Sequence, residues 1–210
     1  MMWEKGYLDP KQMSGSFQML RSYDLIWSKM IDDYMTGKER GMIDLLAWNA
    51  DATRMPYKMH TEYLKKLFLN NDFAEGHFRV EGEVIAPKNV DLPIFGVSTE
   101  MDHIAPWKSV YKIHLMMNSD ITFVLANGGH NAGIVSEPKH KGRFYLIHEN
   151  KKNMSYFGPE KWLKVAKKKD GSWWLAWHDW LVRHSSYKQV PKRTINPSLP
   201  PAPGSYVMQK

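Results

Sequence analysis

Cysteine is absent from this chain of 210 residues. Its absence excludes disulfide bonds, thiolate-bound metal sites and a cysteine nucleophile supplied by the chain itself. It also fits a protein of the cytoplasm, where disulfides are rare. A reaction that needs a protein thiolate would therefore have to obtain it from another stretch of polypeptide.

Long apolar runs are also missing. No stretch approaches the roughly 20 apolar residues that a membrane-spanning helix needs. The first ten residues, MMWEKGYLDP, lack the apolar segment of a secretory signal peptide. The sequence therefore predicts a cytoplasmic protein without a membrane span. A chain of this length can build one substantial core, or a core with a small second unit.

Acidic residues are outnumbered: 22 Asp and Glu stand against 29 Lys and Arg, which gives a formal net charge of +7. A basic balance favours anionic partners such as nucleic acid, acidic membranes or phosphate-bearing small molecules. The excess gathers in the last third of the chain, in KHKGR, ENKKN, KVAKKKDG and KQVPKR. Such runs are most often solvated surface, and this is the interpretation we favour here.

Apolar spacing is helical in the first part of the chain. Side chains three or four positions apart form stripes over 16–35 and 57–69, which predicts helices there. The stretch 77–85 alternates around a Glu-Gly turn and predicts either a small hairpin or a strand and its approach. The last residues, including SLPPAPGSYV, are too rich in proline for regular structure.

The pattern changes after the hairpin. Short apolar runs at 92–98 and 121–127 predict two buried strands, and helical spacing over 107–117 predicts a helix between them. A strand, a helix and a strand with short connections form a βαβ unit, which implies a parallel sheet and an α/β fold. Two more helices are predicted over 158–169 and 171–185. The second should cover a sheet face with a stripe of Trp173, Trp174, Trp177, Trp180 and Leu181.

Asp102 and His130 occupy equivalent places in the βαβ unit. Each follows its predicted strand by a few residues, on a loop at the carboxyl edge of the sheet, where open α/β sheets bind ligands. We therefore expect the two loops to be neighbours. A carboxylate can fix the tautomer of an imidazole, which then acts as general base towards a hydroxyl or thiol. Gly128 and Gly129 give the histidine loop the backbone freedom for close approach to a nucleophile.

Other interpretations of this pair stay open. A single glycine-flanked histidine is more often a turn residue than a catalyst, and it is the matching Asp102 that favours catalysis for His130. A metal site of Asp102, His103 and His130 fits no strong zinc spacing, because adjacent Asp and His side chains rarely reach one ion. The order nucleophile, acid, histidine is that of the α/β-hydrolase fold. No serine stands in a G-x-S-x-G frame, so the acid and the base are present without a nucleophile.

Several longer motifs carry a resemblance to a known family. In chain order they are DLLAWNADATRMPYKMHTEYLKKLFLNN, TEMDHIAPWKSVYKIH, GGHNAGIVSEP, GSWWLAWHDWL and APGSYV. Together they span nearly the whole chain. With these motifs the chain resembles the C-terminal half of poly(3-hydroxyalkanoate) synthases, bacterial enzymes that polymerise hydroxyacyl-CoA into a storage polyester.

The resemblance implies a partial α/β-hydrolase fold. Residues 1–75 would be a helical cap, 76–185 the C-terminal part of a mostly parallel core, and 186–210 a Pro-rich tail. It further implies that Asp102 is the acid and His130 the base that activates a cysteine lying upstream of Met1. The chain would then be a fragment that is inactive alone.

The resemblance also implies residues near the substrate. These are His103, Arg21 and Asn71. A structural role is an equal alternative for each of them, for example an ion pair of Arg21 with Asp24, or Asn71 at a helix end.

The implied partners are a hydroxyacyl-CoA and a polyester chain, with no cofactor and no metal. The open edge of the strand at 92–98 favours a homodimer or association with the missing N-terminal half. The implied place is the cytoplasm, at the surface of polyester granules.

Two alternative functions remain: an esterase or depolymerase fragment that serves a serine nucleophile, and a basic, aromatic-rich module that binds nucleic acid. Helical core spacing of the tryptophans and the lack of a nucleic-acid motif count against the last.

Overall fold

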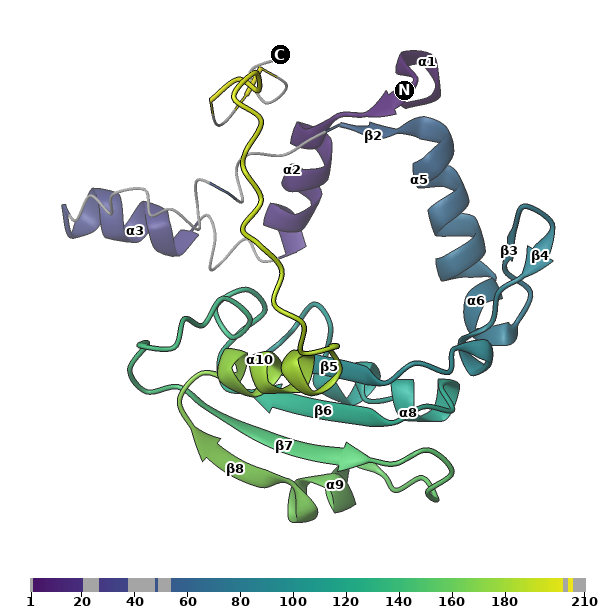
Figure 1. Ribbon diagram of the computed structural model, residues 1–210. Coiled ribbons are helices and arrows are strands. Elements are labelled where there is room, and N and C mark those ends of the chain that lie inside the picture. Colours follow the sequence, from purple (N-terminus) through teal and green to yellow (C-terminus); the bar gives the residue numbers. More distant parts are fainter. Residues whose placement is uncertain (1, 21–26, 38–47, 49–53, 202–203, 206–210) are drawn as a thin grey trace. The chain divides into compact units, whose positions relative to one another are not determined.

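The computed structural model describes residues 2–20, 27–37, 48, 54–201 and 204–205 (Figure 1). The chain divides into two compact units. One is Asp72–Lys192, and the other joins Met1–Asn71 to Arg193–Lys210. The N-terminal unit therefore includes part of the segment predicted as a separate tail. The assignment of residues 1–75 to a cap stays a prediction.

Helices make up most of the described N-terminal unit. They are α1 (Met2–Lys5), α2 (Pro10–Leu20), α3 (Ser28–Met35), α5 (Tyr57–Tyr63) and η2 (Leu64–Leu69), a π-helical continuation of α5. A short antiparallel pair joins β1 (Tyr7–Leu8) to β2 (Met55–Pro56). The helical spacing over 57–69 is confirmed, and so is that over the described part of 16–35.

A hairpin stands near the start of the C-terminal unit. After α6 (Asp72–Glu75), the strands β3 (Arg79–Val80) and β4 (Glu83–Val84) pair antiparallel. The two residues between them, Glu81 and Gly82, have φ of 50° and 89°. Two left-handed residues in a row are typical of a type I′ turn, whose twist matches that of antiparallel strands. The predicted Glu-Gly hairpin is thus confirmed, and η3 (Pro87–Asn89) leads on to the main sheet.

The main sheet has four strands in the order β5 (Ile94–Thr99), β6 (Ile121–Ala126), β7 (Phe144–Asn150) and β8 (Lys167–Asp170). β5 and β6 are parallel, as the βαβ pattern predicts. The pairs β6–β7 and β7–β8 are antiparallel. The sheet is mixed, so the prediction of a mostly parallel sheet is wrong for these strands. The chain returns from β6 to β7 through a loop without a crossover helix, which brings β7 back in the opposite direction.

The helix predicted over 158–169 is too long. α9 covers only Pro159–Val165, and the lysine run that follows forms β8. Pro159 stands at the first helical position after Gly158, where its missing N–H costs little. All four residues of β8 are exposed. Lysines on an outer strand discourage pairing with another chain.

One face of the sheet is covered by α7 (Trp107–Val110), α8 (Ile113–Met116) and α9 (Figure 1). Tyr111, Phe123 and Trp162 are fully buried there. The ring of Phe123 meets those of Tyr111 and Trp162 edge-on, with centroids 5.2 Å and 5.3 Å apart. Edge-on aromatic pairs contribute beyond the area that they bury, so this cluster is a main source of the stability of the unit.

The other face is covered by α10 (Trp173–Arg183). Every residue of β6 is buried, because β6 lies between two strands and is covered on both sides. Ile121, Phe123 and Leu125 face the aromatic cluster, whereas Val124 and Ala126 face α10. This explains why β6 is a continuous apolar run in the sequence.

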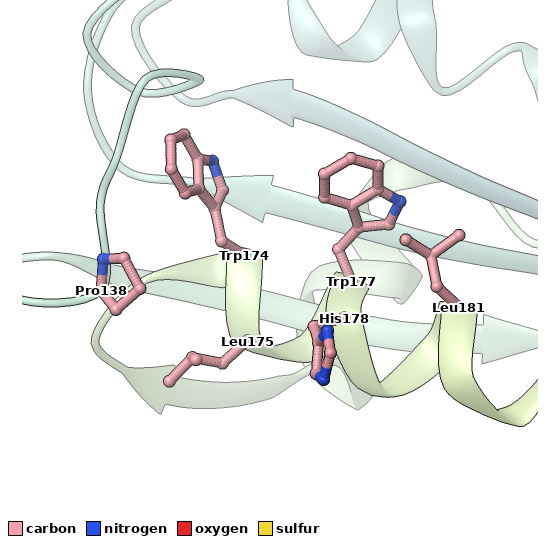
Figure 2. Close-up of a pocket in the computed structure, with 6 residues that line it drawn as sticks. All are labelled: Pro138, Trp174, Leu175, Trp177, His178 and Leu181. Carbon is pink, nitrogen blue, oxygen red and sulfur yellow. The ribbon is translucent and has the colours of Figure 1, made fainter. Parts of the chain in front are cut away.

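The apolar side chains of α10 point to two sides. Trp173 and Trp180 turn towards β5, where their rings lie 6.3 Å and 5.7 Å from the ring of Phe95. Trp177 and Leu181 are each 43% exposed. Of the predicted stripe, Trp173 and Trp180 therefore cover the sheet, whereas Trp177 and Leu181 are exposed. The outer side chains line an apolar hollow formed by Pro138, Trp174, Leu175, Trp177, His178 and Leu181 (Figure 2).

His114 should make the stability of this unit depend on pH, because it is buried and one of its ring nitrogens has no partner among the described residues. Its Nδ1 donates to the carbonyl oxygen of Tyr111 at 2.9 Å, while Nε2 is buried with no hydrogen-bond partner among the described residues. Burial lowers the pKa of His114 and the charge of the nearby His148 lowers it further, against the opposing effect of the Tyr111 carbonyl. A proton added to Nε2 would be buried without an acceptor.

We expect the free energy of unfolding to fall as the pH is lowered through 6.5, the ordinary pKa of histidine, towards the lower pKa of folded His114. The unfolded state binds a proton there that the folded state does not. Chemical denaturation at several pH values, followed by tryptophan fluorescence, measures the slope. His114→Asn keeps a donor for the Tyr111 carbonyl and removes the titration, so its slope should be shallower. An equal slope in both proteins would show that His114 is not responsible.

Candidate active site

The parallel pair β5–β6 carries the two loops of interest away from the same edge of the sheet. Thr99 and Ala126 are paired at the ends of the strands. The ladder continues beyond them, because the amide of Glu100 donates to the oxygen of Ala126 and the amide of Met101 to the oxygen of Gly128. The loops therefore leave together, and Asp102 and His130 come into contact.

Asp102 and His130 form a hydrogen-bonded pair. Nδ1 of His130 lies 2.9 Å from Oδ2 and 3.0 Å from Oδ1 of Asp102. Because an ionised carboxylate can only accept, the proton of the neutral imidazole belongs on Nδ1. The Nε2 nitrogen then carries the free lone pair. The Asp102 side chain is 8% exposed and that of His130 is 43% exposed, so the imidazole extends from a covered carboxylate towards open space.

The backbone around Asp102 keeps its side chain ionised. Oδ1 accepts from the amides of Ile104 at 2.9 Å and Ala105 at 2.8 Å. Burial alone raises the pKa of Asp102, but the hydrogen bonds from Ala105, His130 and Ile104, with the charge of His130, outweigh it and hold the pKa below its ordinary value of 3.8. Asp102 is therefore an anion near neutral pH, able to stabilise a protonated imidazole.

Glycines shape the loop that presents His130. Gly128 has φ of 108°, and a Cβ there would lie 2.9 Å from Nη1 of Arg143. A Cβ on Gly133 would collide with the side chain of the buried Thr99. Gly128 thus supplies the backbone freedom that we predicted. Gly129 has room for a side chain. Gly133, whose contact fixes the loop against β5, was not singled out from the sequence, although the GGHNAG motif contains it.

The other predicted site residues lie in different surroundings. His103 is exposed next to Asp102. Asn71 belongs to the N-terminal unit, directly after Asn70, the C-cap residue of η2, and has φ of 54°. This is the left-handed position after a helix, which asparagine tolerates. Arg21 lies outside the described residues. In the part of the chain that the structure describes, no group of three His, Asp or Glu side chains is placed to hold a metal ion.

The whole chain is similar to known proteins. It is 38% identical to the poly(3-hydroxyalkanoate) polymerase of Methylorubrum extorquens over 100% of the chain and 34% of that protein. It is 37% identical to the poly(3-hydroxyalkanoate) polymerase subunit PhaC of Rhizobium etli, over 98% of the chain and 32% of the relative. The chain is a relative of the poly(3-hydroxyalkanoate) polymerases.

A further polymerase matches the chain at lower identity. The subunit PhaC of Cupriavidus necator is 30% identical over 95% of the chain and 34% of its own length. The chain thus spans about one third of the length of these curated polymerases. No family model matches the chain. Among the helices that the structure describes, none has the length and apolar character needed to cross a membrane.

Proposed function

We propose that this chain supplies the acid and the base of a polyester synthase of the α/β-hydrolase type, and that it works with a cysteine from another stretch of polypeptide. The observation that supports this most is the Asp102–His130 pair, with Nδ1 bound to the carboxylate and Nε2 left for a reactant. The polymerase relatives support the substrate class, a 3-hydroxyacyl-CoA. The cytoplasm, at the surface of polyester granules, is the place that fits such a reaction.

The first half of the reaction loads the acyl group. Nε2 of His130 takes the proton of the cysteine thiol, and the thiolate attacks the thioester carbonyl carbon of the hydroxyacyl-CoA. The bond between the acyl carbon and the CoA sulfur breaks. The CoA thiolate leaves with the proton that His130 held. Asp102 stabilises the imidazolium in between, so the charge on His130 is never unpaired.

The second half extends the polyester. The hydroxyl of a growing chain gives its proton to Nε2 of His130, and its oxygen attacks the acyl group on the cysteine. An ester bond forms, the bond to the cysteine sulfur breaks, and the sulfur takes back the proton. His103, Asn71 and Arg21 are proposed to line the path of the substrate, and neither a metal nor a cofactor takes part.

β5 is the strand to which the rest of the proposed fold would be added. It forms one edge of the main sheet, and only its partner β6 is hydrogen-bonded to it among the described strands. The opposite edge is the lysine strand β8. We infer that a portion equivalent to the N-terminal part of the polymerase relatives, or a second subunit, pairs with β5 and brings the cysteine to His130.

Reconstitution tests the proposal. The chain is mixed with the remaining two thirds of the Methylorubrum extorquens polymerase, and CoA release from 3-hydroxybutyryl-CoA is measured together with polymer formation. We expect release only from the mixture. Because this chain contains no cysteine, alkylating it beforehand should change nothing, whereas alkylating the other portion should abolish the reaction.

The same assay separates the alternatives. CoA release with free hydroxy acid and no polymer would favour the esterase or depolymerase. Activity that survives alkylation of the complementary portion, or an inactive mixture in which the two portions demonstrably bind each other, would overturn the proposal.

A further inference from the structure

The loop that carries His130 ends in a single helical turn. The amide of Gly133 donates to the oxygen of Gly129, and the amide of Val135 to the oxygen of Asn131, each at 2.9 Å. A lone turn leaves its last carbonyl groups without partners inside the turn. Buried or half-buried carbonyls of this kind need donors from elsewhere in the fold.

Three side chains at the start of α10 supply those donors. Nε1 of Trp173 donates to the oxygen of Gly133 at 3.1 Å, and Nε1 of Trp174 donates to the oxygen of Ile134 at 2.9 Å. The hydroxyl of Ser172 donates to the oxygen of Ser136. We call these three residues, Ser172, Trp173 and Trp174, the α10 clamp. They stand about 40 residues after the loop in the sequence and have no part in the reaction proposed above.

The clamp is itself held by a helix cap and by packing. Ser172 Oγ also accepts from the amide of Trp174 at 3.0 Å and so caps the helix from which both indoles project. The Trp173 ring is buried against Val124 and Ala126 of β6. The same indole therefore packs on the strand that leads to His130 and binds the turn that follows it. An indole N–H whose ring is fixed by packing holds its acceptor in position more precisely than a mobile donor does.

We propose that Trp173 and Trp174 are positioning residues for His130. This rests on the proposed role of His130 as the base. By holding the carbonyls of Gly133 and Ile134, the two indoles keep the loop closed over Thr99 and the Nδ1 nitrogen of His130 in line with Asp102. Without these donors the carbonyls would turn towards water, and the imidazole would lose its fixed orientation.

The test uses the full chain labelled with nitrogen-15. The hydrogen-bonded Nδ1 proton of His130 should give a low-field resonance in the nuclear magnetic resonance spectrum. Amide hydrogen exchange reports on Gly133 and Val135. In Trp173→Phe we expect the low-field resonance to broaden or disappear. The two amides should exchange about tenfold faster, as the loss of one hydrogen bond implies. Trp174→Phe should act in the same direction.

Two matched variants control for the loss of ring atoms. Trp162 is fully buried on the opposite face of the sheet, and its indole N–H has no hydrogen-bond partner among the described residues. Trp162→Phe should therefore lower the melting temperature and leave the His130 resonance in place. Trp177 lines the hollow of Figure 2 on the same helix as Trp174, and Trp177→Phe should also leave the resonance unchanged.

An unchanged His130 resonance in both clamp variants would overturn the inference, and so would an equal loss in Trp162→Phe. These readouts need no nucleophile and no turnover. They therefore test the positioning role even if the reconstituted enzyme is inactive. Conversely, if the His130 resonance does not change in the variants, the inference is wrong even if the reconstituted enzyme is active.

Discussion

His130→Ala should lower the rate of CoA release by the reconstituted enzyme roughly 1000-fold or more. The reason is that, in the proposed mechanism, Nε2 of His130 takes the proton of the thiol, while Nδ1 is bound to Asp102. Without the imidazole, the thiol stays protonated and attacks the thioester slowly. Initial rates are measured with a thiol reagent for free CoA at saturating 3-hydroxybutyryl-CoA.

A second histidine provides the control. His140 also has Nδ1 2.9 Å from a carboxylate oxygen, that of Glu137, and its side chain is 41% exposed, almost as much as that of His130. His140→Ala removes the same group from a similar pair outside the parallel strand ends. We expect its rate to stay within about twofold of the parent, because an exposed pair contributes little. Similar losses in both variants would point to damaged folding, and full activity of His130→Ala would remove the base from the mechanism.

Asp102→Asn should reduce the same rate roughly 1000-fold. An amide is close to a carboxylate in shape but carries no charge, so it cannot stabilise the imidazolium that forms when His130 takes the proton. Its NH₂ group can also donate to Nδ1, which would move the imidazole proton to Nε2 and make that nitrogen unable to act as a base. The measurement is the initial rate of CoA release, with the His130 tautomer followed by nitrogen-15 chemical shifts.

The amide variant has its own matched control. Glu137→Gln neutralises the other carboxylate that binds a histidine, and its side chain is 56% exposed, against 8% for Asp102. It should leave the rate nearly unchanged. If Asp102→Asn acts through His130, combining it with His130→Ala should add little to the loss seen with His130→Ala alone, because residues that work as a unit are not additive. Independent losses that multiply would contradict the paired mechanism.

Much of this site follows from local pattern. The apolar run of β6 predicts a buried strand because a central strand covered on both faces has no polar side. The shorter run at β5 and the helical spacing between them predict the parallel pair. Once that pair is expected, the places of Asp102 and His130 just beyond the two strands bring them together, since parallel strands end at the same edge. The Glu-Gly turn predicts its hairpin for a similar reason, because two successive left-handed residues favour one turn type.

Other features depend on contacts between distant residues. The strand β7 contains His148 and Glu149 among its apolar residues, so it has no clear period of its own and is recognisable only by its pairing with β6. The lysines of β8 have the composition of a helix surface, and their pairing with β7 makes them a strand. Similarly, helical spacing groups Trp173 with Trp177, but packing against Phe95 buries the first and leaves the second exposed.

The sequence by itself therefore determined the parallel pair β5–β6, the meeting of Asp102 with His130 beyond its ends, and the absence of a cysteine thiol from the chain. These features follow from the spacing of side chains a few positions apart and from which residue types are present. Neither depends on contacts with distant parts of the chain. Only the tertiary structure decided the direction of β7, the strand at β8, the contact of Gly133 with Thr99 and the hydrogen bonds from Trp173 and Trp174 to the His130 loop. The physical reason is that these features depend on strand pairing and on hydrogen bonds between residues tens of positions apart. No short stretch of sequence encodes such contacts.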